Sequence, residues 1–407
     1  MAAARAMPVE GFRVVAPDRR RHGEKMCDLV AKAFSSGGYF RFHEVCRTGY
    51  ILNSHYDWAV SRIGLLGDRI ATHYGVWNVR MRIGTAVVRV GGIGAVATDA
   101  DCRKRGLMAR TARASVRAMR DGGYDLSLLF GISDFYHRFG YTRAWSESDY
   151  IIGLGDLPKE KPNVRLGTFN PKPRNDTAAL YNRAGAGLTG TAVRPTYTRI
   201  PWPRPMQGRR WTDARGRLAG YVVFEVHDGR FECCEACGNV DAILRVLAVL
   251  ARQYACREVR LETMHDASPL IRRVRRGTCR VETRHHRCGG AMVALVDLPA
   301  ALEKMRGELS RRLRQSHLAG WRGSLLLVHG REAATLAIDR SRVRVTVGGT
   351  SKHAIRGGDG IVQLLIGTDE PAAVIEATRL KPTGDARRLA DILFPNEHPR
   401  MALQDRF

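Results

Sequence analysis

The sequence predicts a mixed α/β protein (α+β in its details) made of three consecutive blocks. Its 407 residues are too many for one ordinary hydrophobic core and suit two or three domains of about 100–200 residues each. Strands and a helix alternate between residues 57 and 153, and the same order returns between residues 220 and 264. Alternating apolar segments follow residue 323. We expect the blocks to span residues 1–155, 156–299 and 300–407.

The first block shows paired strands, a glycine-containing turn, a helix and further strands, in that order. Gly122 and Gly123 mark the end of the helix. The expected elements are paired strands over 57–98, a helix over 103–121, a short apolar strand over 124–130 and a strand over 143–153. An α/β unit of this kind is suited to bind a nucleotide-like ligand.

The second block repeats this order, which indicates a degenerate duplication. Its expected elements are a hairpin over 220–236 with an Asp-Gly turn, an amphipathic helix over 241–255 and a strand over 258–264. Two proline-rich stretches, 157–173 and 194–207, have the composition of linkers.

The third block begins with an amphipathic helix over 300–320, whose apolar face is expected to pack and whose basic face is expected to be solvated. Four alternating segments then predict a third domain built around an antiparallel sheet. These segments are 323–328, 333–338, 343–347 and 362–365.

The chain is strongly basic, with 66 Lys and Arg against 40 Asp and Glu and a formal net charge of +26. The basic runs at 272–276 and 311–314 contain no aromatic residues on which bases could stack, which disfavours nucleic acid as a partner. A positive field also serves small acidic ligands. No apolar run approaches the roughly 20 residues that span a bilayer, and residues 1–10 lack the pattern of a secretory signal. We therefore expect a cytoplasmic protein.

Nine unevenly spaced cysteines indicate reduced thiols rather than a disulfide framework. Cys234 and Cys237, with the cysteines and histidines between 279 and 288, raise zinc binding as an alternative. Residues three apart on a straight strand point to opposite faces, however, and the later spacing matches no familiar zinc pattern. We expect structural thiols and no metal.

A basic turn at the start of the first expected helix is the first motif with chemical content. The strand ending Val96-Ala97-Thr98 leads into Arg103-Lys104-Arg105-Gly106-Leu107-Met108-Ala109. Free N–H groups at a helix start bind phosphate, the helix dipole adds to this, and glycine permits close approach. The strand edge near Val96 can hydrogen-bond a pantetheine arm as another strand would. The alternative is a basic helix start on a solvated surface, a placement that is unfavourable for the dipole.

Phe135-Tyr136-His137-Arg138-Phe139-Gly140-Tyr141 is the second motif. Tyr136 comes 30 residues after Gly106 and just beyond the strand that should border a cofactor sulfur. Its phenol, with an ordinary pKa of about 10, can protonate a departing thiolate. The alternative is that Tyr136 only packs among its aromatic neighbours. The compact spacing after the strand adds Ile132 and Ser133 as candidate cofactor contacts.

Together these motifs resemble the GNAT superfamily, and more specifically the enhanced-intracellular-survival (Eis) type of N-acetyltransferase. The resemblance extends over essentially the whole chain, from the Val-Ala-Thr strand and the Arg-Lys-Arg-Gly-Leu-Met loop, through Phe-Tyr-x-Arg-Phe-Gly-Tyr, to the final phenylalanine. It implies a catalytic GNAT domain, a second GNAT-like domain and a C-terminal domain like sterol carrier protein. Many GNAT loops place Gly or Ala where this chain has Met108.

The resemblance also implies an activity: direct acetyl transfer from acetyl-CoA to a primary amine, such as an aminoglycoside, a polyamine or a lysine side chain. Acetyl-CoA would lie against Val96–Thr98 and Lys104–Ala109, with Tyr136 as general acid and the C-terminal carboxylate of Phe407 as base. A free α-carboxylate has an ordinary pKa of about 3.3–3.7, so burial or an intervening water would have to assist it. A homo-oligomer, by resemblance a hexamer, is implied as well.

Two alternatives remain at this point. The chain could be a non-catalytic acyl-CoA or lipid-binding protein, acting through its third block. The C-terminus could also be a frayed, solvated end, as most chain ends are. The second block has Cys237-Gly238-Asn239-Val240 after its strand in place of an Arg-x-x-Gly loop. We expect that it does not bind acetyl-CoA and that it shapes the substrate cleft.

Overall fold

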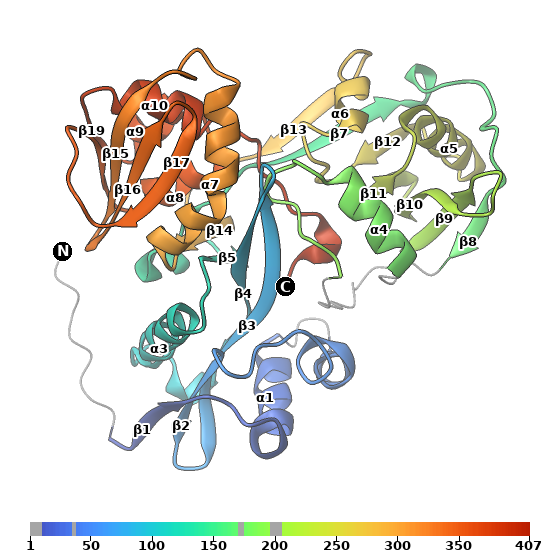
Figure 1. Ribbon diagram of the computed structural model, residues 1–407. Helices are drawn as coiled ribbons and strands as arrows, with labels where there is room; N and C mark the ends of the chain where they lie inside the picture. The colour runs from blue at the N-terminus through green and yellow to red at the C-terminus, as the bar shows by residue number, and fades with distance from the viewer. Residues whose placement is uncertain (1–9, 35–37, 170–174, 196–205) are drawn as a thin grey trace.

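The computed structural model describes residues 10–34, 38–169, 175–195 and 206–407, and these residues form three mixed sheets covered by helices (Figure 1). Part of the first expected linker (170–174) and most of the second (196–205) lie outside the described residues, as do residues 1–9. Where the first linker is described, Gly167–Phe169 forms a strand, β8.

The first sheet has seven strands in the order β1–β2–β3–β4–β5–β14–β6. Their bounds are Phe12–Val15 (β1), Arg62–Leu66 (β2), Arg69–Ile83 (β3), Ala86–Thr98 (β4), Leu126–Gly131 (β5), Gly290–Leu295 (β14) and Thr142–Arg143 (β6). β3 and β4 form a long antiparallel hairpin, whereas β5 runs parallel to β4. The connection between these parallel strands contains the helix α3.

Helices cover both faces of this sheet because side chains on a strand alternate between its faces. Tyr74 and Val76 on β3 share a core with α3, while Trp77 and Val79 share another with α1. The helical elements of this part are α1 (Arg19–Ala33), α2 (Tyr39–Val45), a π-helical turn (Cys46–Tyr50), two 3₁₀ turns (Ala100–Cys102 and Tyr136–Phe139) and α3 (Leu107–Asp121). The helix expected from Arg103 thus begins four residues later, because Gly106 has a left-handed backbone with φ of 71°.

The second sheet repeats the plan of the first, in the order β13–β7–β12–β11–β10–β9–β8. Its other strands are Arg280–Arg284 (β13), Glu147–Gly153 (β7), Glu258–Leu261 (β12), Arg230–Cys237 (β11), Leu218–His227 (β10) and Gln207–Thr212 (β9). Its helices are α4 (Asn175–Ala184), α5 (Val240–Gln253) and α6 (Pro269–Val274), with a 3₁₀ turn at Leu154–Asp156. As in the first sheet, an antiparallel pair is followed by a helix and a parallel strand. The expected hairpin, helix and duplicated order are confirmed.

Two strands cross between the first two sheets. β14 comes from the second expected block but pairs with β5 and β6 in the first sheet. β7 comes from the first expected block but pairs with β12 and β13 in the second. The single strand expected over 143–153 is therefore two strands in two sheets. Sequence periodicity shows that a segment is a strand, but not which sheet it joins.

The third sheet has the order β17–β16–β15–β18–β19. Its strands are Arg342–Val347 (β17), Glu332–Asp339 (β16), Arg322–His329 (β15), His353–Gly357 (β18) and Lys381–Thr383 (β19); its helices are α7 (Leu298–Arg314), α8 (Gly360–Ile366), α9 (Pro371–Ala377) and α10 (Ala386–Leu393). The strand expected over 362–365 was wrong, because these residues lie in α8. α8 is buried on all sides, and a short, mostly apolar run does not distinguish helix from strand. The sheet is mixed, since β15 and β18 are parallel.

One continuous hydrophobic core joins the first and third parts of the chain. It includes Met81 and Val88 of the β3–β4 hairpin and Leu302, Met305 and Leu309 of α7. Figure 1 shows α7 lying between the third sheet and this hairpin. Among the helices of the described residues, none is both long enough and apolar enough to cross a membrane.

Glu308 on α7 locks the tip of the hairpin to the third part. Its buried carboxylate accepts hydrogen bonds from the Thr85 hydroxyl (2.6 Å) and from Arg311 and Arg312 (2.5 and 2.8 Å). Burial alone would raise the pKa of this carboxyl, but the hydrogen bonds from Arg311 and Thr85 outweigh burial and lower the pKa to about 2.

We therefore predict that Glu308→Gln lowers the free energy of unfolding by roughly 3 kcal/mol, because it leaves buried cationic and hydroxyl donors poorly matched. The matched control is Glu303→Gln on the same helix, whose half-exposed pair with Arg306 should contribute less than about 1 kcal/mol. The folded-state pKa lies below the ordinary value of 4.5. The difference in the free energy of unfolding between wild type and Glu308→Gln should therefore be largest above pH 4.5. It should shrink as the pH falls toward 2. Urea unfolding at several pH values measures this free-energy difference. Equal urea midpoints for Glu308→Gln and Glu303→Gln would contradict the prediction.

Candidate active site

The main cleft opens where the parallel strands β4 and β5 separate. Their pairing ends at Ile93 opposite Leu129, and beyond this point β4 pairs only with β3 on its other side. The edge of β4 from Gly94 to Thr98 is thus free on one side and borders a cleft of about 670 Å³. Backbone groups on a free strand edge can hydrogen-bond an extended ligand.

A bulge at Ala95 reshapes this edge. The register between β3 and β4 shifts near His73 and Gly75, and Ala95 has a left-handed φ of 48°. The fully buried His73 supports the bulge, with Nδ1 2.7 Å from the Ala95 carbonyl oxygen and Nε2 2.8 Å from the Tyr56 hydroxyl. Since a carbonyl only accepts, Nδ1 donates and Nε2 accepts from Tyr56. Burial lowers the pKa of His73 to about 4, so a neutral imidazole fixes the bulge.

The start of α3 forms one end of the cleft. Lys104 and Gly106 both have left-handed backbones (φ 59° and 71°), which turn the chain sharply into the helix. No side chain caps the first turn, and this turn contains no acidic residue. The N–H groups at this helix start therefore have no side-chain acceptor, and exposed Arg103, Lys104 and Arg105 stand beside them. This combination fits an anionic group such as a pyrophosphate.

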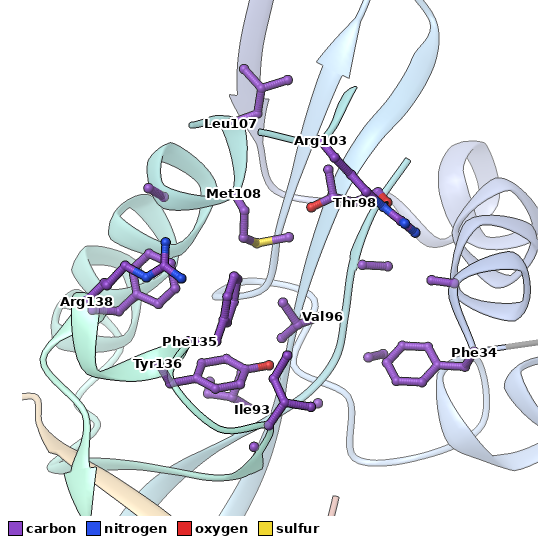
Figure 2. A pocket seen from close by; sticks show the side chains of 18 of the residues that line it. Phe34, Ile93, Val96, Thr98, Arg103, Leu107, Met108, Phe135, Tyr136 and Arg138 are labelled. Atoms are coloured by element: carbon purple, nitrogen blue, oxygen red, sulfur yellow. The ribbon is translucent and has the colours of Figure 1, made fainter. Parts of the chain in front are cut away.

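Tyr136 lies on the opposite wall, directly after β5. Its ring lies against Gly131, where a Cβ atom would come within 2.5 Å of it. The ring also packs against Phe135 and Tyr141, with centroids 4.9 and 6.2 Å away. The ring therefore packs among its aromatic neighbours and also lines the cleft. Figure 2 shows its hydroxyl pointing across the cleft toward Ile93 and Val96. Burial raises the pKa of this phenol well above its ordinary range, so it stays protonated.

The C-terminal residue lies in the same cleft rather than frayed in solvent. Phe407 is only 8% exposed. Its ring lies so close to Gly92 that a Cβ there would come within 2.5 Å of it. A Cβ at Gly94 would come within 3.0 Å of the Phe407 carboxyl carbon and 2.6 Å of the Tyr50 hydroxyl. Glycine inside a strand weakens it and marks a close approach; here the approaching group is the end of the chain.

All but one of the residues expected from sequence to contact the cofactor or to act in catalysis line this cleft. Those that do are Val96, Ala97, Thr98, Lys104, Arg105, Gly106, Leu107, Met108, Ala109, Ile132, Tyr136 and Phe407. Ser133 does not. The chain turns away at Asp134, which has a φ of 59°, and the exposed Ser133 lies against Gly289 instead.

Sequence reasoning missed the aromatic wall of the cleft. Phe34, Phe42, Tyr50 and Phe130 line it near Phe407. The spacing of aromatic residues between 34 and 50 is the signal that could have suggested a helical face. No local pattern, however, shows that this face meets β4.

The cysteines and histidines considered for zinc do not converge. Within the described ranges, no three of Cys234, Cys237, Cys279, His285, His286 and Cys288 place ligand atoms together. Cys234 instead lies near Glu225 and Glu262, and Cys288 lies near Asp134 and His137.

The second sheet has a smaller cleft at the corresponding place. A cavity of about 190 Å³ is bordered by Cys234–Gly238, beyond the last pairing of β11 with β12. Here the helix start is occupied, because the Asn239 side chain accepts from the Ala242 N–H and Asp241 lies in the first turn. This end of the cavity does not fit a second anionic group.

Comparisons with known proteins agree with this geometry. Residues 15–144 match the family model described as an acetyltransferase (GNAT) domain. A GCN5-related N-acetyltransferase from Anabaena variabilis has a TM-score of 0.75 at 16% identity. A probable N-acyltransferase from Enterococcus faecalis has 0.72 at 18% identity, and Eis1 from Mycobacterium abscessus has 0.70 at 15% identity. Each alignment covers 97% of this chain and 100% of the other.

At these identities the structural similarity establishes a shared fold over nearly the whole chain. No curated protein sequence shows significant similarity. Residues 15–144 are therefore an acetyltransferase domain of the GNAT superfamily, within a chain whose overall fold is that of Eis1.

Proposed function

We propose that the protein transfers an acetyl group from acetyl-CoA directly to a primary amine. The observation that carries this proposal is the arrangement within one cleft. An uncapped, basic helix start stands at one end, a free strand edge lies in the middle, and Tyr136 and Phe407 both line the cleft. These three features occur in the same order as the pyrophosphate, the extended pantetheine arm and the thioester of acetyl-CoA.

Each part of the cleft has a separate task in this proposal. The N–H groups at Leu107–Ala109 and the neighbouring cations hold the diphosphate. Backbone groups of Val96–Thr98 pair with the amides of the pantetheine arm, and backbone N–H groups near Val96 polarise the thioester carbonyl. The Phe407 carboxylate accepts the proton that the amine loses as its nitrogen bonds to the acetyl carbon. The carbon–sulfur bond breaks, and Tyr136 gives its proton to the leaving sulfur.

The acetyl acceptor is a primary amine, and an aminoglycoside, a polyamine and a lysine side chain each carry one. We also propose that the three blocks act as a catalytic domain, a degenerate GNAT-like domain without acetyl-CoA and a sterol-carrier-like domain, in a cytoplasmic homo-oligomer.

A non-catalytic acyl-CoA or lipid carrier is the competing function. Release of free thiol from acetyl-CoA, assayed with a panel of amines, separates the two, because a carrier releases none.

Tyr136→Phe removes only the hydroxyl and keeps the ring on Gly131. We expect kcat to fall about 10²–10⁴-fold, the range for losing a general acid, while the KM for acetyl-CoA stays within about twofold of wild type. The matched control is Tyr141→Phe, whose buried hydroxyl bonds to Ser127 (2.6 Å) and Tyr74 (3.0 Å) outside the cleft. It should lower the melting temperature with little change in kcat. Unchanged turnover in Tyr136→Phe would reject the assignment.

Appending residues after Phe407 converts its carboxylate into an amide and forces bulk against Gly92 and Gly94. Turnover should fall at least about 10²-fold, whereas equilibrium binding of acetyl-CoA persists. The same residues added before Met1 serve as the control. Full activity in the extended protein would remove Phe407 from the mechanism.

Lys104→Gln with Arg105→Gln removes two cations beside the helix start. The KM for acetyl-CoA should rise several-fold, with kcat nearly unchanged, because the diphosphate contacts are the same in the ground and transition states. The rise should shrink as salt increases, since exposed charges are screened. An equal KM at low salt would place the diphosphate elsewhere.

A further inference from the structure

A fully buried ion cluster joins the second sheet to the C-terminal tail. Arg194, which follows α4, has Nε 2.8 Å from Asp405 Oδ1 and Nη2 3.1 Å from Asp405 Oδ2. Its other edge meets Glu235 on β11, with Nη1–Oε1 of 2.8 Å and Nη2–Oε2 of 2.5 Å. Asp405 has no exposed surface and lies only two residues before Phe407.

The cluster is well satisfied. The Arg194 guanidinium lies 3.6 Å from the Tyr181 ring centroid, and the Tyr221 hydroxyl donates to Glu235 at 2.6 Å. Burial alone would lower the pKa of Arg194, but Asp405 and Glu235 outweigh burial and raise it well above its ordinary value. Buried ion pairs add little stability compared with apolar packing, and their best-attested use is to fix one arrangement. Here the arrangement that they fix is the path of the tail.

Two further anchors hold the same segment. The Arg400 guanidinium donates to the Ser146 carbonyl (2.6 Å) and to Asp266 (3.2 Å). The Arg406 guanidinium donates to Glu147 on β7 (2.6 Å) and lies 4.3 Å from the Phe130 ring centroid. Apart from Phe130, these partners lie on the second sheet or in segments next to it.

The tail also covers the cavity that corresponds to the cofactor cleft. Arg400 and Ala402 line this cavity together with Glu235. In the second domain the parallel strands β11 and β12 thus separate as β4 and β5 do in the first. The cavity between them, however, is lined by the chain's own C-terminal segment. Figure 1 shows this segment, in red, passing the second domain and ending beside the β3–β4 hairpin.

We infer that the second domain is a receptor for residues 400–407, and that Arg194 and Asp405 are positioning residues that place the Phe407 carboxylate against β4. This inference rests on the proposed role of Phe407. A tail released at Asp405 is held near its end only by Arg406 and by the packing of Phe407, so the carboxylate no longer has one fixed position. Misplacement of a reacting group by about 1 Å can already cost 10²-fold in rate.

The test uses the full chain with Asp405→Asn, which keeps the size of the side chain but removes its charge. Arg194 remains paired with Glu235, so the variant should fold. Arg194→Lys is a second variant, which keeps the charge and loses the two-pronged geometry. The matched control is Asp149→Asn. Asp149 is equally buried and pairs with Arg260 at 2.7 Å in the same sheet, but it does not contact the tail segment.

Four quantities are measured: kcat, the KM for acetyl-CoA, the melting temperature, and the rate at which a carboxypeptidase releases the terminal phenylalanine, followed by mass spectrometry. In Asp405→Asn and Arg194→Lys we expect kcat to fall about 10²-fold, an unchanged KM and rapid release of Phe407. Asp149→Asn should lower the melting temperature alone, with the tail protected as in wild type.

Wild-type kcat together with a protected tail in both variants would overturn the inference. Rapid release of Phe407 with full kcat would support the receptor and remove the carboxylate from the mechanism. If the extended protein is inactive while both variants behave as wild type, the proposed base stands and the receptor role falls.

Discussion

β4 and β5 separate beyond Ile93, and this separation creates the cleft around which the surrounding elements are arranged. Two parallel strands that part leave one strand edge without a partner in a place that is otherwise buried. Unpaired backbone groups are costly inside a protein, so the edge needs either a ligand or a cover. The chain supplies rigid walls instead of a cover: α3 and its uncapped start, the Tyr136 turn and the aromatic residues of α1 and α2. The neutral, buried His73 fixes the bulge at Ala95 from behind.

The glycines of β4 have different partners on its two faces. Side chains at Gly92 and Gly94 would collide with Phe407, and a side chain at Gly91 would collide with Met119 of α3. The strand therefore accepts the tail on one face and the helix on the other. Tyr136 and the C-terminal residue Phe407, the proposed acid and base, line the same cleft beside this strand.

The three parts of the chain are interdependent. β14 completes the first sheet, β7 completes the second, and α7 extends the first hydrophobic core into the third part. The tail then returns from the third part along the second to the cleft of the first. An acetyltransferase domain cut out at its family boundaries, 15–144, would lose β14, nearly all of β1 and the tail, and with them two strands of its sheet and one wall of its cleft.

The local features could be predicted from the sequence: the strand and helix order, the duplicated block, the basic turn at Gly106, and Tyr136 and Phe407 as candidates. These follow from periodicity, turn residues and short motifs, which act over a few residues. Contacts between distant segments, in contrast, make 362–365 a buried helix, place Ser133 against Gly289 and send β7 and β14 to each other's sheets. They also bring Phe34, Phe42 and Tyr50 to the cleft and Arg194 to Asp405, 211 positions later. These contacts depend on which surfaces meet, and a local pattern holds no information about its distant partner.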